Sequence, residues 1–189
     1  MDVPPHQRFK LLGLSGSLRR ASNSTAILRT LKAGLTPDIE MEIVALDDIP
    51  PYNEDNDIGE GPAGVAGLRR AVIACDGIVV VSPEYNHGIP GHLKNAIDWA
   101  SRPPNQVLDA KPVAIFGTSP GATGTIRGQA HLRQILGNLN SYVLVQPVVA
   151  IGNAPQRFDA DANITDEATR AFVVSMLVKL VDWTRRLKA

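Results

Sequence analysis

Short apolar runs alternate along the chain with segments whose apolar residues recur every three or four positions. The runs predict strands at residues 9–14, 41–45, 78–82, 112–117 and 142–145. The segments between them predict helices with one apolar face, as in Ile27, Leu28, Leu31 and Leu35. Further helices are expected around 65–72, 91–101, 132–139 and 173–187. This alternation is typical of βαβ units, which build a parallel sheet.

Five such units predict an α/β fold of the flavodoxin-like, doubly wound type. We expect a five-stranded parallel sheet in the order 2-1-3-4-5 with helices on both faces. The polar stretch 46–61, rich in prolines, glycines and acidic residues, is expected to be a surface loop. No repeat or low-complexity linker divides the 189 residues, which suffice for one full core. We therefore expect a single domain over residues 1–189.

Charge and composition narrow the classes of partner. The chain has 19 basic and 19 acidic residues and no basic run longer than a pair, which argues against nucleic acid or an anionic membrane surface. Its apolar runs are too short to span a bilayer, and the segment 1–8 lacks the apolar core of a secretory signal. One cysteine and four scattered histidines leave no disulfide and no metal-ligand cluster. We expect a cytoplasmic protein without a bound metal, in which Cys75 is a buried structural thiol.

The loop between the first strand and its helix carries the first candidate chemistry. Hydroxyl, amide and guanidinium donors gather there at the start of a predicted helix: Ser15, Ser17, Arg19, Ser22, Asn23 and Ser24. A helix N-terminus favours an anion, and such side chains add hydrogen bonds to phosphate oxygens. A Walker loop and a dinucleotide fingerprint are both absent from this run. The pattern favours a terminal monophosphate over the alternative, an ordinary Ser/Asn cap beside a solvated arginine.

Two further loops follow the third and fourth strands, at the same expected edge of the sheet. The first, residues 83–91, could hold a flat polar ring with Pro83, Glu84, Tyr85, Asn86 and His87. Glu84 has the alternatives of bracing its loop or contacting a partner subunit, and His87 that of a solvated residue. In the glycine-rich loop 117–124, Thr118, Ser119 and Gly121 could approach the ring, the alternative being a flexible turn. Together the three loops predict a mononucleotide site at the switch point of the sheet.

These residues resemble the NAD(P)H-dependent FMN reductase family, which includes azoreductases and chromate/quinone reductases. The likeness rests on Gly16-Ser17-Leu18-Arg19 with Ser22-Asn23, and on Pro83-Glu84-Tyr85-Asn86 followed by Pro90-Gly91 and the segment 93–99. The resemblance implies that FMN is the cofactor of the domain. By it, the phosphate is held by Ser17, Arg19, Asn23 and Ser24, the isoalloxazine by residues 83–86, and its polar edge by Ser119 and Gly121. It also implies a homodimer or homotetramer with the flavin near a subunit boundary.

The resemblance implies an enzyme that passes two electrons from NADPH or NADH through FMN to a small acceptor. Quinones, azo compounds, free flavin and chromate-like oxidants are the acceptors it suggests. No catalytic side chain is then expected, because the flavin carries the chemistry. The alternative is a flavodoxin-type one-electron carrier without nicotinamide activity, which the neutral charge of the chain disfavours.

Two details stay open at this point. A 2′-phosphate of NADPH would need a basic contact, for which Arg19, Arg20, Arg102 and Arg127 are candidates. The helix that carries Trp99 could cover the flavin of a neighbouring subunit, or Trp99 could be part of the core.

Overall fold

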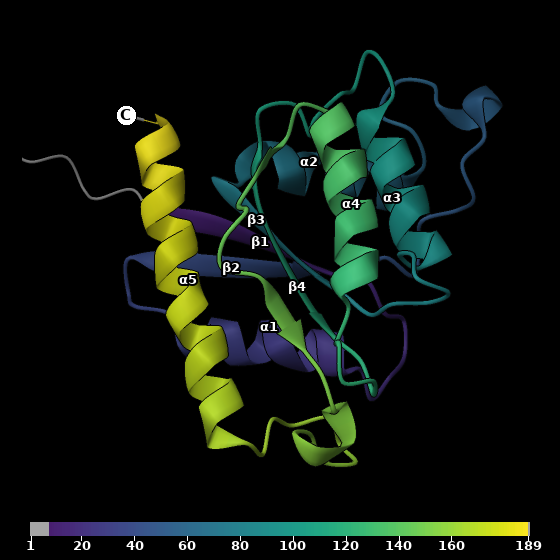
Figure 1. The fold of residues 1–189 in the computed structure, drawn as a ribbon. Coiled ribbons are helices and arrows are strands. Elements are labelled where there is room, and N and C mark those ends of the chain that lie inside the picture. Colours follow the sequence, from purple (N-terminus) through teal and green to yellow (C-terminus); the bar gives the residue numbers. More distant parts are fainter. Residues whose placement is uncertain (1–7, 189) are drawn as a thin grey trace, which may run out of the picture.

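The computed structural model describes residues 8–188 and consists of a parallel sheet between two layers of helices (Figure 1). The strands are β1 (Phe9–Ser15), β2 (Ile39–Val44), β3 (Gly77–Ser82), β4 (Pro112–Thr118), β5 (Tyr142–Val143) and β6 (Val149–Ile151). Their order is β2-β1-β3-β4-β5, with β6 also paired to β4, so the predicted sheet order is confirmed. Residues 1–7, most of the segment considered above for a secretory signal, lie outside the described part.

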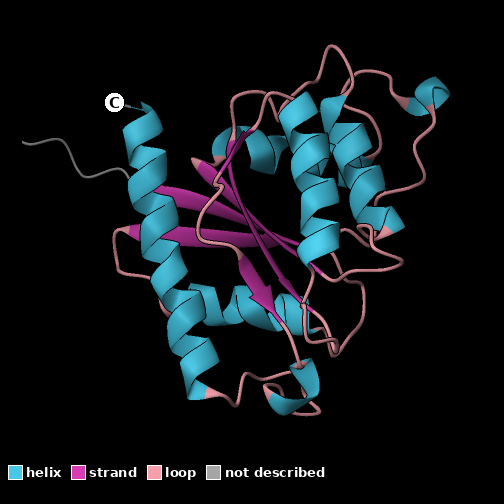
Figure 2. Ribbon diagram, in the orientation of Figure 1, coloured by secondary structure: helices cyan, strands magenta, loops and turns pink. Residues whose placement is uncertain are grey.

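The helices cover both faces of the sheet (Figure 2). On one face α1 (Asn23–Ala33) and α5 (Glu167–Lys188) enclose one apolar core, and on the other α2 (Ala63–Ala74), α3 (Gly91–Ser101) and α4 (Ile126–Asn138) enclose the second. Because both faces are covered, every residue of β3 and β4 is buried, which explains their continuous apolar sequences. Two short 3-10 helices, η1 (Glu54–Asn56) and η2 (Ala154–Gln156), complete the elements. No helix within residues 8–188 combines the length and apolarity needed to cross a membrane.

The fifth position of the sheet differs from the predicted strand at residues 142–145. The strand β5 ends at Val143 after pairing with Pro112 and Val113, and the chain rejoins β4 six residues later as β6. Pro147 lies in the gap, and a proline has no N–H to donate to a neighbouring strand. Two short pieces therefore occupy the place of the single predicted strand.

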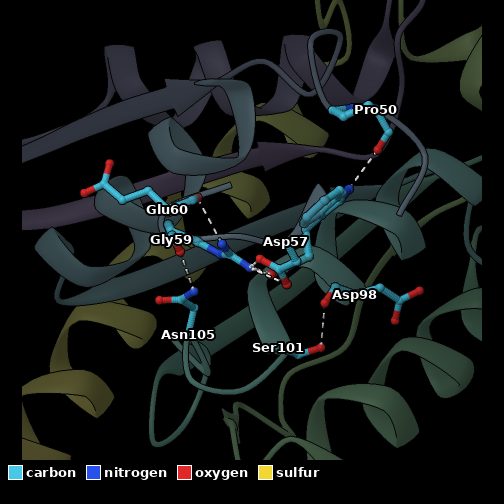
Figure 3. A network of polar contacts seen from close by, with 9 residues as sticks. Pro50, Asp57, Gly59, Glu60, Asp98, Ser101 and Asn105 are labelled. Atoms are coloured by element: carbon cyan, nitrogen blue, oxygen red, sulfur yellow. Dashed lines mark hydrogen bonds and ion pairs between the residues drawn. The ribbon is translucent and has the colours of Figure 1, made fainter. Parts of the chain in front are cut away.

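The polar stretch 46–61 has an unexpectedly firm anchor on α2. The guanidinium of Arg69, whose side chain is only 4 % exposed, is 2.9 Å from a carboxylate oxygen of Asp57 (Figure 3). It also donates to the main-chain oxygens of Glu60, at 3.0 Å, and Trp99, at 2.7 Å. A buried charge requires such partners, and here they come from the loop and from α3 as well. The stretch 46–61 is thus a surface loop that the side chain of Arg69 anchors to α2.

Side chains of α3 also hold the first part of the stretch 46–61. The fully buried Trp99 donates from Nε1 to the main-chain oxygen of Pro50 at 2.8 Å (Figure 3). The side chain of Asn95 donates to that oxygen at 2.8 Å and accepts the N–H of Tyr52 at 2.7 Å. Of the two alternatives for Trp99, the core residue is therefore correct, and its side chain is not available to cover a neighbour's ligand.

Candidate functional site

The three candidate loops leave the sheet side by side, because β1, β3 and β4 are adjacent parallel strands. Ser15, the last residue of β1, pairs with Val81, and Ser82, the last residue of β3, pairs with Gly117. The main-chain N–H of Gly16 donates to the oxygen of Val81 at 2.8 Å and ties the first loop to β3. The predicted loops therefore meet at the carboxyl edge of the sheet, where open α/β folds bind ligands.

Two serines of the first loop have partners within the protein. The hydroxyl of Ser15 lies 2.9 Å from that of Thr25 and donates to the main-chain oxygen of Ser17 at 3.2 Å. Ser22 is the N-cap of α1, where its hydroxyl oxygen accepts the N–H of Thr25 at 3.1 Å. The capping alternative is therefore correct for Ser22, although this bond does not use its O–H.

Free donors remain at the start of α1. Within residues 8–188, the main-chain N–H groups of Asn23 and Ser24 have no hydrogen-bond acceptor, and the first turn of α1 contains no acidic residue. Arg19 is exposed, and its guanidinium donates only one bond in the described chain, to the oxygen of Ala21 at 3.2 Å. Ser17 and Asn23 are half-buried beside it, while the side chain of Ser24 is buried. This donor set, next to the positive end of a helix dipole, fits a terminal phosphate.

The second loop presents a tight turn. Tyr85 and Gly88 exchange two main-chain hydrogen bonds, of 3.0 and 2.9 Å, so that Asn86 and His87 form the tip. Both tip residues have positive φ, 51° and 62°, as a type I′ turn requires. Tyr85 is 51 % exposed, and the two tip residues are exposed as well. The two main-chain hydrogen bonds therefore fix the shape of the turn, while the side chains of Tyr85, Asn86 and His87 stay exposed.

Before this turn the second loop is half-buried at Pro83 and Glu84. The carboxylate of Glu84 accepts the main-chain N–H of Gly128, in the first turn of α4, at 2.8 Å. This hydrogen bond supports the alternative in which Glu84 braces its loop. The side chain of Pro83 has no polar atom, so it can contribute only to the shape of the loop.

The third loop is closed by its own hydrogen bonds. The hydroxyl of Ser119 donates to the oxygen of Gly124 at 2.6 Å, and the oxygen of Gly121 accepts the N–H of Gly124 at 3.2 Å. Thr118 is different, because its buried hydroxyl has no hydrogen-bond partner in the described chain. A buried hydroxyl without a partner is costly. Its position at the end of β4 fits a ligand with polar ring edges.

β6 and the residues directly after it support this loop, and the sequence reasoning missed them. The oxygen of Ile151 accepts the N–H of Ser119 at 3.1 Å, and the N–H of Asn153 donates to Gly121 at 3.1 Å. Their signal was an apolar run, Val149–Ile151, followed by Gly152 and Asn153, the same strand-then-turn pattern as in the other loops. The expectation of a strand at 142–145 left these residues unassigned.

Two basic residues, His92 and Arg102, lie at opposite ends of α3. His92 lies in the first turn of α3, directly after the second loop, and burial lowers its pKa although the carboxylate of Asp47 opposes that shift. Arg102 follows the other end of the 11-residue α3, about 16 Å away at 1.5 Å per residue, with its guanidinium 6.0 Å from the ring centre of Tyr52. Arg102 therefore lies at the opposite end of α3 from the second loop.

A sheet of this order, with a donor-rich helix start and two further loops at the same carboxyl edge, is typical of flavodoxin-like proteins. Comparison with known proteins specifies the class. The FerB flavoenzyme NAD(P)H:(acceptor) oxidoreductase from Paracoccus denitrificans superposes with a TM-score of 0.84 at 32 % identity, covering 94 % of this chain and 98 % of its own. An NAD(P)H-dependent FMN reductase of Pseudomonas aeruginosa is 42 % identical over 180 residues, 95 % of this chain and 97 % of that protein. A 2-hydroxy-1,4-benzoquinone reductase of a Burkholderia species is 37 % identical over 178 residues, 94 % of this chain and 97 % of that protein.

The model of the NADPH-dependent FMN reductase family matches residues 9–156, and the chain belongs to this family. It is accordingly an oxidoreductase that uses FMN with NAD(P)H as the electron donor. The matched range includes all three loops and ends within η2, so α5 lies outside the matched range.

Proposed function

We propose that the three loops hold one FMN and that the protein reduces quinones and related flat oxidants at its exposed face. The observation that carries the proposal is the convergence, at the carboxyl edge of the sheet, of donors that have no partner within residues 8–188: the N–H groups of Asn23 and Ser24 and the hydroxyl of Thr118. The phosphate would lie on Ser17, Arg19, Asn23 and Ser24, with Ser15 and Ser22 shaping the loop beneath it.

The isoalloxazine would lie between the second and third loops. Residues 83–86 would line one side of the ring, with His87 at the rim, and Thr118, Ser119 and Gly121 would approach its polar edge. The bound flavin supplies two-electron redox chemistry, and the protein supplies position and electrostatics. The exposed aromatic ring of Tyr85 is suited to stack against a flat nicotinamide or quinone.

Quinones are the acceptors we propose first, since several relatives are named as quinone reductases. Azo compounds, free flavin and chromate-like oxidants remain part of the proposal, because an open flat site admits them all. We also propose that residues 1–189 act as one FMN-binding domain in the cytoplasm, where reduced nicotinamides are abundant. Arg19, Arg20, Arg102 and Arg127 are the proposed contacts for the 2′-phosphate of NADPH.

The test is a spectroscopic titration of the purified protein under anaerobic conditions. We expect flavin absorption bands that NADPH or NADH bleaches, and that a quinone restores with the stoichiometry of two electrons. Comparison of quinones, azo dyes, flavins and chromate then ranks the acceptors. Flavin that neither nicotinamide bleaches would contradict the proposal and favour an electron carrier.

The phosphate assignment has its own measurement. Replacing Arg19 by Ala removes a charged donor and should weaken FMN binding by about 1.5–3 kcal/mol, the range for a hydrogen bond to a charged group. Because Arg19 is exposed, the lower end of this range is expected. Arg29→Ala, on the exposed side of α1, is the matched control. An FMN dissociation constant unchanged in both Arg19→Ala and Ser17→Ala would overturn the assignment.

A further inference from the structure

The first turn of α4 takes its hydrogen-bond acceptor from a different loop. Thr125 occupies the N-cap position, but its side chain does not cap the helix, because its hydroxyl accepts the side-chain N–H of Gln129 at 3.1 Å. The carboxylate of Glu84 accepts the N–H of Gly128 instead, at 2.8 Å, from a position 44 residues earlier in the chain. The first turn of α4 contains no acidic residue of its own. Glu84 therefore satisfies one of the unpaired N–H groups and complements the positive helix end.

The turn and the helix also meet without a side chain between them. A Cβ atom at Gly128 would lie 3.3 Å from the main-chain oxygen of Gly88 and 3.3 Å from Cγ of Glu84. At Gly88 the same atom would lie 3.2 Å from Nδ1 of His131, in the next turn of α4. Glu84 precedes the Tyr85–Gly88 turn and Gly88 ends it. Both legs of the turn are thus docked on the first two turns of α4.

We propose that Glu84 is a positioning residue whose carboxylate clamps the ring-holding turn to α4. The inference rests on the proposed function, because it takes the Tyr85–Gly88 turn as one wall of the flavin ring. Since α4 continues directly from the third loop, the clamp joins the loops after β3 and β4 into one rigid cradle. The phosphate loop after β1 has no part in this contact. The structure thus separates a ring-holding unit from a phosphate-holding unit.

This separation predicts which ligands each substitution affects. Glu84→Ala removes the acceptor of the Gly128 N–H and with it the hydrogen bond that holds the residue before the Tyr85–Gly88 turn on α4. Binding of the flavin ring should therefore weaken. FMN and riboflavin should lose affinity by the same factor, roughly tenfold for a contact of this strength. Arg19→Ala should weaken FMN and leave riboflavin unchanged, since riboflavin has no phosphate. Glu84→Gln keeps an acceptor oxygen and should recover most of the affinity lost in Glu84→Ala.

The experiment combines flavin titration with amide hydrogen exchange of the flavin-free protein. Wild type, Glu84→Ala, Glu84→Gln and Gly128→Ala are compared, with Glu54→Ala, an exposed carboxylate on η1, as the matched control. Among the three Glu variants, we expect only Glu84→Ala to exchange its amide hydrogens faster than wild type in segments 83–90 and 126–130. Gly128→Ala introduces the crowded Cβ while keeping the carboxylate and should weaken both flavins. It tests the same contact if Glu84→Ala folds poorly.

The outcomes separate this inference from the proposed function. Wild-type protein that binds neither flavin would overturn the proposed function, while the exchange data still report on the clamp. Wild-type binding with unchanged riboflavin affinity in Glu84→Ala and Gly128→Ala would overturn the inference alone. Unchanged exchange in segment 83–90 of Glu84→Ala would do the same, and so would a loss in Glu84→Gln as large as that in Glu84→Ala.

Discussion

Gly117, the next-to-last residue of β4, lies between the end of β3 and the N-cap residue of α4. A Cβ atom there would be 1.8 Å from the hydroxyl of Thr125 and 2.6 Å from the main-chain oxygen of Ser82. Gly117→Ala should therefore destabilise the protein by about 1–3 kcal/mol, because crowding in a packed region shifts its neighbours. Urea unfolding at constant pH measures the loss.

The matched control is a glycine with open space around it. At Gly67, inside α2, a Cβ would meet no atom within 4 Å, and Ala favours a helix over Gly by about 0.5–1 kcal/mol. Gly67→Ala should stabilise the protein by about this amount. Equal effects of the two substitutions would show that contact geometry at Gly117 does not determine its role.

The pKa of His92 links the start of α3 to the pH dependence of stability. Burial lowers this pKa below its ordinary value of 6.5, so the unfolded chain takes up the proton first as the pH falls. The contribution is complete above about pH 6.5 and is lost as the pH falls from there towards the lowered pKa. His92→Gln should therefore flatten the fall in the urea midpoint as the pH drops below about 6.5, measured beside wild type.

The sequence indicated which residue types gather at the candidate site, but not the contacts that each of them makes in the structure. Ser, Asn and Arg after an apolar run indicate a phosphate loop, yet only the structure shows that the hydroxyl oxygen of Ser22 accepts the N–H of Thr25. Glu84 had several possible roles because its partner, Gly128, is remote in sequence. The sequence could not show that the Thr118 hydroxyl lacks a hydrogen-bond partner in the described chain, because its possible partners lie on neighbouring strands and loops.

Among the elements, the loop 46–61 is expected to contribute to stability through one ion pair. Asp57→Ala leaves the buried guanidinium of Arg69 without its counter-ion and should cost about 3–5 kcal/mol, partly offset by the carbonyl oxygens of Glu60 and Trp99. The control is Glu60→Ala, which removes the exposed ion pair with Arg70 and should cost about 0–1 kcal/mol. Thermal unfolding of both variants measures the difference, and similar losses would contradict this account.

The period of the apolar residues predicted most elements to within a few residues. Buried strands and one-sided helices each leave a distinct period, which is why the parallel sheet followed from their alternation. The strand order came from the flavodoxin-like type of fold that five such units suit. The fifth position was harder, because Tyr142–Val145 is apolar enough for a strand although only its first two residues pair. The anchoring of 46–61 could not be read either, since a buried Arg–Asp pair looks like any charged pair in a polar sequence.

At the scale of the whole molecule, we propose that the working unit is a homodimer or homotetramer. Tyr85 and Ile126 expose about half of their side chains, 51 % and 53 %, next to the contact between the second loop and α4. A second copy against this region would remove part of this apolar surface from water. Light scattering coupled to size exclusion should give at least twice the chain mass of 20.3 kDa at micromolar concentration. A fully active species of single-chain mass would contradict this proposal.

The interruption between β5 and β6 has a consequence for behaviour in concentrated solution. A long, straight edge strand offers unpaired N–H and C=O groups to other chains and can seed aggregates. Here one edge consists of pieces of two and three residues separated by Pro147, beside the exposed side chains of Val145 and Val148. The opposite edge, β2, carries Glu40 and Glu42. Both margins of the sheet therefore discourage intermolecular β-pairing, one by broken geometry and the other by charge.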